Sequence, residues 1–205
     1  MAVLETIDLK LYPMGDYWIA LLRGVNVGTA KRIAMADLRA IVQGLGYQEV
    51  ATLLNSGNVV FRQPKGAKAP PAPGIEQAVA KRLGVSAAVI AMPVTALDAI
   101  LRANPLAKPS RDPSRLLVAA VRDGAALGRL AALAKQDWGR EELACGPAAG
   151  YLWCPDGISA GALFMALNKA LGDGVTMRNW ATMLKLQAMT RAPAATASKP
   201  PRRAK

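Results

Sequence analysis

Short apolar runs alternate along the chain with stretches in which apolar residues recur every three or four positions. The run at 17–23 (YWIALLR) has the length and composition of a buried strand. A loop rich in Gly and Asn follows, and the apolar residues from Leu38 to Leu45 then recur at helical spacing. Gly46 is expected to end that helix. The pattern therefore predicts a strand followed by an amphipathic helix.

The next part of the chain completes a recognisable order of elements. Asn55-Ser56-Gly57 separates two short apolar segments and predicts a hairpin. The elements predicted from here are strands over 51–54 and 58–62, a helix over 75–83 and a strand over 87–94. The order β-α-β-β-α-β is that of the ferredoxin-like motif, in which two helices cover one face of a four-stranded antiparallel sheet.

A similar pattern begins again after a helix over 95–103 and a Pro-rich join over 104–113. The elements predicted for this second half are a strand over 115–122, a helix over 125–135, hairpin strands over 141–144 and 151–154, a helix over 158–171 and a helix over about 177–189. The second half is thus predicted to end in a helix where the first ends in a strand. The predicted fold class is α+β, with two related ferredoxin-like halves, antiparallel sheets, a C-terminal helix and a disordered basic tail. The alternative is that the duplication is a coincidence of pattern.

These elements predict a division of the chain into five parts. They are an N-terminal extension over 1–15, a first ferredoxin-like half over 16–95, a linking helix and Pro-rich join over 96–113, a second α+β half over 114–189 and a basic tail over 190–205. The Pro-rich segment 63–74 is predicted to be a solvated loop inside the first half. The tail carries five basic residues, no acidic residue and almost no large apolar side chain, which predicts disorder.

The amino-acid composition excludes several classes of catalytic and metal site. The chain of 205 residues has no His, which excludes His-dependent catalysis and His-ligated zinc. Cys145 and Cys154 are spaced for neither a CxxC redox pair nor a zinc site, so we expect two reduced thiols, no metal and no cofactor. Glu5 and Asp8 do not suit a secretory signal, and no apolar run is long enough to cross a membrane. The sequence predicts a cytoplasmic protein without a membrane partner.

The first candidate for chemistry is the loop over 23–32 (RGVNVGTAKR). Gly24 and Gly28 allow positive φ angles and a close backbone approach, and Arg23 and Lys31 supply positive charge. Consecutive N–H groups in such a loop can cradle an anion. The spacing matches neither a Walker A loop nor a dinucleotide-binding GxGxxG motif. The alternative is that the glycines only shape a turn.

Two further polar segments are candidates. Ser56 and Asn58 in the hairpin can present hydrogen-bonding groups beside the first loop, or the hairpin tip can be simply a turn. On the predicted last helix, Arg178 and Lys185 share a face and lie about 10 Å apart along the axis, close enough to contact two phosphates or merely solvated. Trp180 is expected on the core face of that helix.

The runs LLRGVNVGTAKRIAMADLRAIVQGLGY, NSGNVVF and TMRNWATMLKLQAM, taken together, resemble the bacterial family known as domain of unknown function 1697. The resemblance spans residues 17–189. It implies a small cytosolic α+β protein and no established activity. The residues that it marks are Arg23, Gly24, Asn26, Gly28, Lys31, Ser56, Gly57, Asn58, Arg178, Asn179, Trp180 and Lys185.

The chain departs from the family pattern at three positions. Thr29 stands where a second glycine is usual, Asn55 where glutamine is usual, and Ala181 where a second asparagine is usual. Each change removes backbone freedom or alters a side-chain amide. A site that needs those groups would be weakened here.

Three hypotheses of function follow. The formal net charge is +12, and removing the five charges of the tail leaves +7 for residues 1–189, which favours an anionic ligand, either a phosphorylated small molecule or nucleic acid. The segment 56–63 lacks the aromatic pattern of RNA-recognition modules apart from Phe61. The alternatives are an enzyme that works without His through the same polar cluster, and a structural or protein-interaction role. Convergence of Arg23, Asn58 and Arg178 would favour binding or structure over catalysis. The oligomeric state stays open.

Overall fold

The computed structural model describes residues 17–28, 31–64, 66–67, 69–158 and 161–191. The predicted N-terminal extension over 1–15 lies outside the described residues, as does the predicted tail over 190–205 from residue 192 onward. The tail prediction begins two residues too early, because Thr190 and Arg191 form the end of the last helix. Among the helices of the described part, none combines the length and the apolar character needed to span a bilayer.

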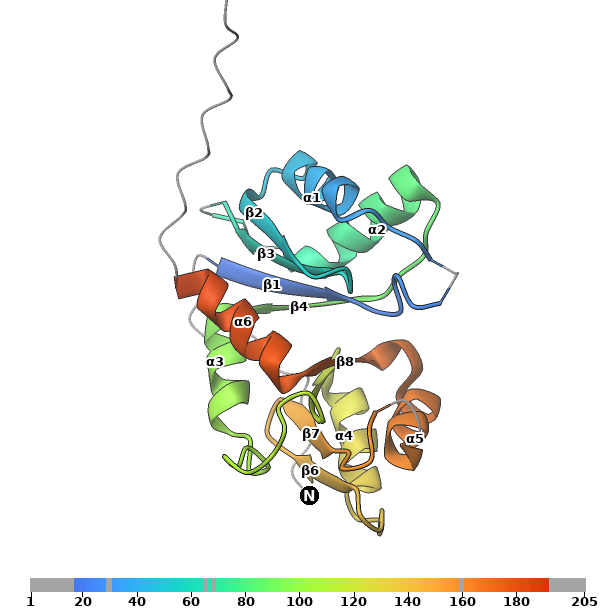
Figure 1. Cartoon of the computed structure of the whole chain (residues 1–205). Coiled ribbons are helices and arrows are strands. Elements are labelled where there is room, and N and C mark those ends of the chain that lie inside the picture. Colours follow the sequence, from blue (N-terminus) through green and yellow to red (C-terminus); the bar gives the residue numbers. More distant parts are fainter. Residues whose placement is uncertain (1–16, 29–30, 65, 68, 159–160, 192–205) are drawn as a thin grey trace, which may run out of the picture.

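The first half is a four-stranded antiparallel sheet with two helices on its outer face (Figure 1). Its elements are β1 (Tyr17–Leu22), α1 (Met35–Gly44), β2 (Gln48–Leu53), β3 (Asn58–Arg62), α2 (Pro71–Leu83) and β4 (Val89–Pro93), followed by α3 (Val94–Arg102). The strands lie in the order β2-β3-β1-β4, so β4 forms one edge beside β1.

The second half repeats this arrangement. Its elements are β5 (Leu116–Val121), α4 (Gly124–Leu133), β6 (Glu142–Cys145), β7 (Ala149–Trp153), α5 (Ala162–Leu171), the short turn η2 (Gly172–Gly174), β8 (Val175–Asn179) and α6 (Trp180–Arg191). The strand order β6-β7-β5-β8 corresponds to that of the first half, strand for strand. The predicted α+β fold with two ferredoxin-like halves and antiparallel sheets is confirmed.

The helix predicted over about 177–189 is wrong at its beginning, because β8 occupies the segment up to Asn179. Val175 and Met177 pack into the core under α4 and α5, whereas Thr176 is buried on the opposite side. This alternation with a period of two is typical of a strand. Each half therefore ends in a strand and then a helix, and the predicted difference between the halves does not exist.

Asn179 marks the point at which the strand gives way to the helix. Its Oδ1 accepts a hydrogen bond from the backbone N–H of Thr182, at 2.9 Å. This is the bond that an N-cap residue makes to the third residue of a helix. An asparagine before the apolar-periodic run is thus the local signal that could have placed the start of α6 correctly.

Two other helix boundaries differ from the predictions. α2 begins at Pro71, four residues before the predicted start, so part of the segment predicted as a loop over 63–74 is helical. Proline fits the first turn of a helix because the N–H that it lacks has no partner there. α5 begins at Ala162 rather than at 158.

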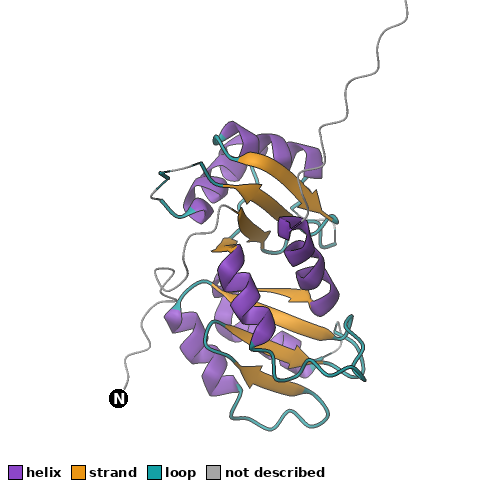
Figure 2. Cartoon of the chain, turned by 90° about the vertical axis from the view of Figure 1, so that its left-hand side faces the viewer, coloured by secondary structure: helices purple, strands orange, loops and turns teal. Residues whose placement is uncertain are grey.

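Each half has a hydrophobic core between its sheet and its outer helices, and a further core lies between the two halves. The inner faces of both sheets pack against α3 and α6, which lie side by side between the sheets (Figure 2). Tyr151 on β7 is fully buried there, and its hydroxyl donates to the carbonyl of Ile100 on α3, at 2.7 Å. Because β5 is covered on both faces, all six of its residues are buried, which explains its unbroken apolar run.

The two thiols should differ in reactivity, since both are free but only Cys145 is exposed. Burial and a hydrogen bond to Glu141 raise the pKa of Cys154 to about 12, and partial burial raises the pKa of Cys145 as well. Iodoacetamide should therefore alkylate Cys145 slowly in the native protein and leave Cys154 unmodified, and denaturant should expose both, as peptide mass spectrometry can measure. Equal native labelling of the two cysteines would contradict the burial of Cys154.

Candidate functional site

The three polar segments meet where the two halves join. The hairpin tip between β2 and β3 lies against the end of β1, where the N–H of Leu22 donates to the carbonyl of Gly57 at 2.8 Å. β8 of the second half brings Arg178 to the same place, and Arg178 Nε donates to Asn58 Oδ1 at 2.5 Å. Segments that are more than a hundred residues apart in sequence thus form one polar junction.

Arg178 is the centre of this junction. Its alternation along β8 points the side chain away from the core of the second half and toward the first half. Every nitrogen of its guanidinium donates. Nε donates to Asn58 Oδ1 at 2.5 Å, and Nη2 donates to the carbonyls of Leu22 and Ser56 at 2.7 Å each. Nη1 donates to Thr176 Oγ1 at 3.0 Å and to the carbonyl of Met177 at 2.8 Å. A guanidinium has five N–H donors, so protein acceptors can satisfy all of them. Burial lowers the pKa of Arg178 to about 10, and the side chain is charged at neutral pH.

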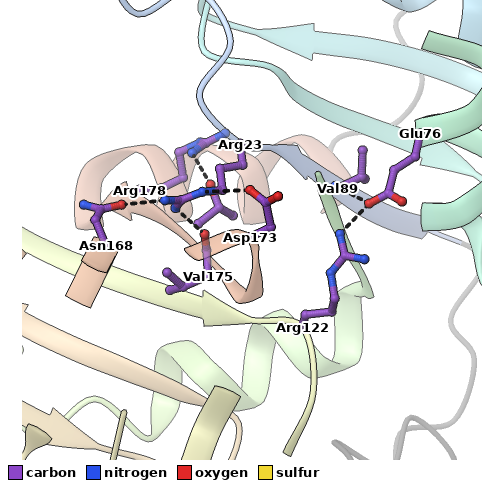
Figure 3. A network of polar contacts seen from close by, with 9 residues as sticks. Arg23, Glu76, Val89, Arg122, Asn168, Asp173, Val175 and Arg178 are labelled. Atoms are coloured by element: carbon purple, nitrogen blue, oxygen red, sulfur yellow. Dashed lines mark hydrogen bonds and ion pairs between the residues drawn. The ribbon is translucent and has the colours of Figure 1, made fainter. Parts of the chain in front are cut away.

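Arg23 makes a second connection between the halves (Figure 3). It follows β1 and donates Nη1 to the carbonyl of Val175 at 2.6 Å and Nη2 to Asn168 Oδ1 at 2.9 Å. Its Nε lies 3.5 Å from a carboxylate oxygen of Asp173, whose side chain is 83% exposed. An ion pair with so exposed a partner contributes little to stability. The neutral acceptors on α5 and β8 are therefore the main anchors of Arg23.

Arg122 occupies the equivalent position in the second half, which the sequence reasoning missed. The N–H of Arg23 donates to the carbonyl of Ala88 before β4, and the N–H of Arg122 donates to the carbonyl of Gly174 before β8. Arg122 then reaches across to Glu76 on α2, at 2.5 Å from Oε1 (Figure 3). The two predicted strands, 17–23 and 115–122, both end in arginine, and aligning them is the signal that could have found Arg122.

Glu76 ties this contact to the sheet of the first half. Its Oε1 also accepts a hydrogen bond from the backbone N–H of Val89, at 2.7 Å, at the start of the edge strand β4. One carboxylate oxygen thus serves a backbone group of its own half and the arginine of the other half. The arginine that follows the first strand of each half contacts the other half.

Asn26 fixes the first loop to the hairpin. The residue has a φ of 56°, its Nδ2 donates to the carbonyls of Ile33 at 2.8 Å and Asn55 at 2.7 Å, and its Oδ1 accepts from the N–H of Ile33 at 2.9 Å. Gly24 and Gly28 in the same loop have φ angles of 64° and 62°. The loop residues Thr29 and Ala30 lie outside the described part of the chain.

Three other residues of the predicted motifs make no side-chain hydrogen bond to the polar junction within the described part of the chain. Lys31 and Lys185 are exposed, and neither ammonium group bonds to another residue in the described part. Lys185 lies on α6, so it does not share a helix face with Arg178, which lies on β8. Trp180 packs partly buried against the central core. Binding of a ligand by the whole predicted set stays a prediction.

A hollow of about 420 Å³ lies beside the junction, at the N-terminal end of α1. Its lining residues are Asn26, Arg32, Ile33, Ala34, Met35 and Asn55. Ala34 is the N-cap of α1 and offers no side-chain acceptor to the first turn. Arg32 is exposed and is the one charged residue of the lining, so the hollow has a positive character.

The fold and this junction define the class of the molecule, a duplicated ferredoxin-like α+β protein whose halves are joined by reciprocal arginine contacts. The family model described as protein of unknown function, DUF1697, matches residues 15–151, and the chain belongs to that family. The resemblance inferred from the motifs is thereby confirmed.

Among solved structures, the chain is similar to one protein over most of that protein's length. It is described as the conserved bacterial protein SP0830 from Streptococcus pneumoniae, with 25% sequence identity and a TM-score of 0.70. The similarity covers 84% of this chain and 97% of that chain. A search among curated proteins gave no match. These comparisons support the α+β fold and the family, and neither description names an activity.

Proposed function

We propose that the protein binds an anionic, phosphate-bearing ligand in the hollow at the N-terminal end of α1. The observation that carries the proposal is the position of Arg32 in the lining of a hollow that also contains the start of a helix. The first-turn N–H groups of a helix have no partner within the helix, and the dipole favours negative charge there. Because Ala34 supplies no cap, a phosphate can take its place as acceptor.

The charged residues near the hollow favour an anion, apart from one acidic residue in the first turn of α1. Lys31 precedes Arg32 and is also exposed, so two basic side chains border the loop. Asp37 lies in the first turn of α1, where its carboxylate competes for the same dipole, but it does not line the hollow. The formal charge of +7 over residues 1–189 attracts anions to the protein as a whole.

The two candidate kinds of ligand have the phosphate group in common. A phosphorylated small molecule and a nucleic acid backbone both present the tetrahedral phosphate oxygens that N–H groups and a guanidinium bind. Salt separates them, because binding to a nucleic acid weakens steeply with ionic strength as each phosphate contact releases counterions.

The test is a titration of the full chain with pyrophosphate and, separately, with a short single-stranded oligonucleotide, at low and near-physiological salt. Arg32→Ala should weaken pyrophosphate binding by about tenfold or more, because a charge-assisted hydrogen bond contributes about 1.5–3 kcal/mol. The matched control is Arg39→Ala, which removes an exposed arginine of α1 that does not line the hollow.

The comparison of the two variants and the two probes decides the proposal. Loss of affinity in Arg32→Ala with wild-type affinity in Arg39→Ala supports binding in the hollow. Equal losses in the two variants would show that only the overall charge matters, and absence of pyrophosphate binding would overturn the proposal. Oligonucleotide binding that exceeds pyrophosphate binding and falls with salt would identify nucleic acid as the source of the phosphate.

A structural role is the second candidate for the polar motifs, favoured by the contacts of Arg178. The guanidinium donors of Arg178 meet acceptors from both halves, including Asn58 and the carbonyl of Leu22. A group that is already satisfied by the protein gains little from a ligand. Arg23, Asn58 and Arg178 are thereby best suited to hold the halves together, while an enzymatic role without His stays a prediction.

A further inference from the structure

Two neighbouring hollows lie in a cleft between the two halves. It has a polar chamber of about 650 Å³ and an apolar chamber of about 210 Å³, and Arg122 lines both. Neither chamber shares a lining residue with the hollow beside α1. Ligand sites in proteins occur preferentially at interfaces between such units, where apolar walls meet a few polar groups.

The apolar chamber is built from the edge strand of one sheet and the end of a strand of the other. Its lining residues are Pro70, Ala72, Val89, Ile90, Ala91, Met92, Ala96, Ile100, Val121, Arg122 and Ala148. Arg122 is the one charged residue among them. The chamber exceeds the engineered cavity of about 150 Å³ that holds benzene, so it accepts a ring or a short alkyl chain.

The five charged residues that line the polar chamber differ in what they contact. Its three carboxylates are engaged, Glu76 with Arg122, Asp173 with Arg23, and Asp123 with the N–H of Ala126 at the start of α4. Arg129 on α4 is exposed and bonds to no other residue within the described ranges. The guanidinium of Arg129 lies beside Gly174, where a Cβ would be 3.3 Å from Nη2. The lining therefore carries three carboxylates and two guanidinium groups, and Arg129 is the guanidinium that no carboxylate of the lining engages within the described ranges.

Arg122 stands at the boundary of the chambers with donors to spare. Its side-chain bond to Glu76 uses Nη2 alone. A guanidinium has five N–H donors, and a carboxylate can accept two of them in parallel. An anion that enters beside Arg122 does not have to break the contact with Glu76.

We propose that the cleft binds a small carboxylate with an apolar body. The body occupies the chamber between β4 and α3, and the carboxylate contacts Arg122 and Arg129. Because Arg122 follows β5 and β4 belongs to the first half, such a ligand touches both halves at once. The site rests on residues separate from those of the proposed phosphate site, so either can fail without the other.

The experiment is isothermal titration calorimetry of the full chain with three probes at low salt. Octanoate carries both features, acetate carries the carboxylate without the body, and octylammonium carries the body with the opposite charge. We expect octanoate to bind with a Kd below about 1 mM and the other two probes to show no binding at that concentration. Equal binding of octanoate and octylammonium, or no binding of octanoate, would overturn the proposal.

Two variants locate the binding. Arg129→Gln should weaken octanoate binding about two- to fivefold, because the arginine is exposed and its charge is screened. Ala72→Leu should remove binding, because the longer side chain occupies the apolar chamber. The matched control Arg82→Gln changes an exposed arginine of α2 outside the lining and should leave the Kd unchanged. If Ala72→Leu does not fold, Arg129→Gln alone decides, and an unchanged Kd in Arg129→Gln would contradict the proposal.

Discussion

Arg178→Ala should lower the free energy of unfolding by about 3 kcal/mol or more. The substitution leaves Asn58 Oδ1 and the carbonyl of Leu22 without the donor that they have in the native protein, and both residues are fully buried. Each buried polar group that loses its partner costs about 1–3 kcal/mol. Urea denaturation followed by circular dichroism and by Trp fluorescence measures the loss.

Two further variants separate this effect from a loss of charge. Arg178→Lys keeps the charge but cannot reproduce five donors in a planar fork, so it should be destabilised nearly as much as Arg178→Ala. Lys185→Ala removes an exposed charge of the same sequence motif and should change the stability by less than about 0.5 kcal/mol. If Arg178→Lys were as stable as the wild type, charge rather than hydrogen bonding would hold the junction.

The architecture was accessible from the sequence because its signals are local. The apolar run over 17–23 reflects a strand covered on both faces, and the structure buries its residues 18–22. The helical spacing reflects burial of one helix face, and the structure buries Leu38, Ile41 and Val42. The hairpin required only the turn at Gly57, whose φ is 70°. Local patterns of this kind depend on neighbours in sequence, and they define elements without placing them against each other.

The junction was not accessible in the same way, because its partners are distant in sequence. Arg178 bonds to Ser56 across 122 positions, and Arg122 to Glu76 across 46. The resemblance to a family marked Arg178 without showing whether it faces a ligand or a protein acceptor. A mistaken helix also placed it on a face with Lys185. Only the strand alternation of β8 turns it toward the first half.

The central core explains why both halves keep a helix after their last strand. α3 and α6 cover the inner faces of both sheets and contact each other, so neither sheet is left with an open face. A ferredoxin-like sheet alone has helices on one face only. The helix after the last strand of each half, together with Arg23 and Arg122, packs the two halves into a single unit. The cleft beside Arg122 lies where that packing is incomplete.

Gly57→Ala should destabilise the protein by about 2–4 kcal/mol. A Cβ at this position would lie 2.6 Å from Val25 Cγ2 and 2.7 Å from Leu22 Cβ, and the φ of 70° is unfavourable for alanine. Positive φ costs about 1–2 kcal/mol and overpacking about 1–3 kcal/mol. Gly46→Ala is the matched control, because its φ is 88° and nothing lies within 4 Å of a Cβ there. The difference between the two variants, measured in urea, isolates the close approach of the hairpin tip to β1.

The same close approach holds Ser56 and Asn58 within reach of Arg178. A Cβ on Gly57 displaces the tip and should weaken those bonds, so the effects of Gly57→Ala and Arg178→Ala should not add. The double variant should be more stable than the sum of the two losses predicts, by about 0.5–3 kcal/mol. Additive losses would mean that the hairpin tip and the arginine stabilise the junction independently. A coupled loss would show that the glycine matters chiefly because it lets the tip reach the second half.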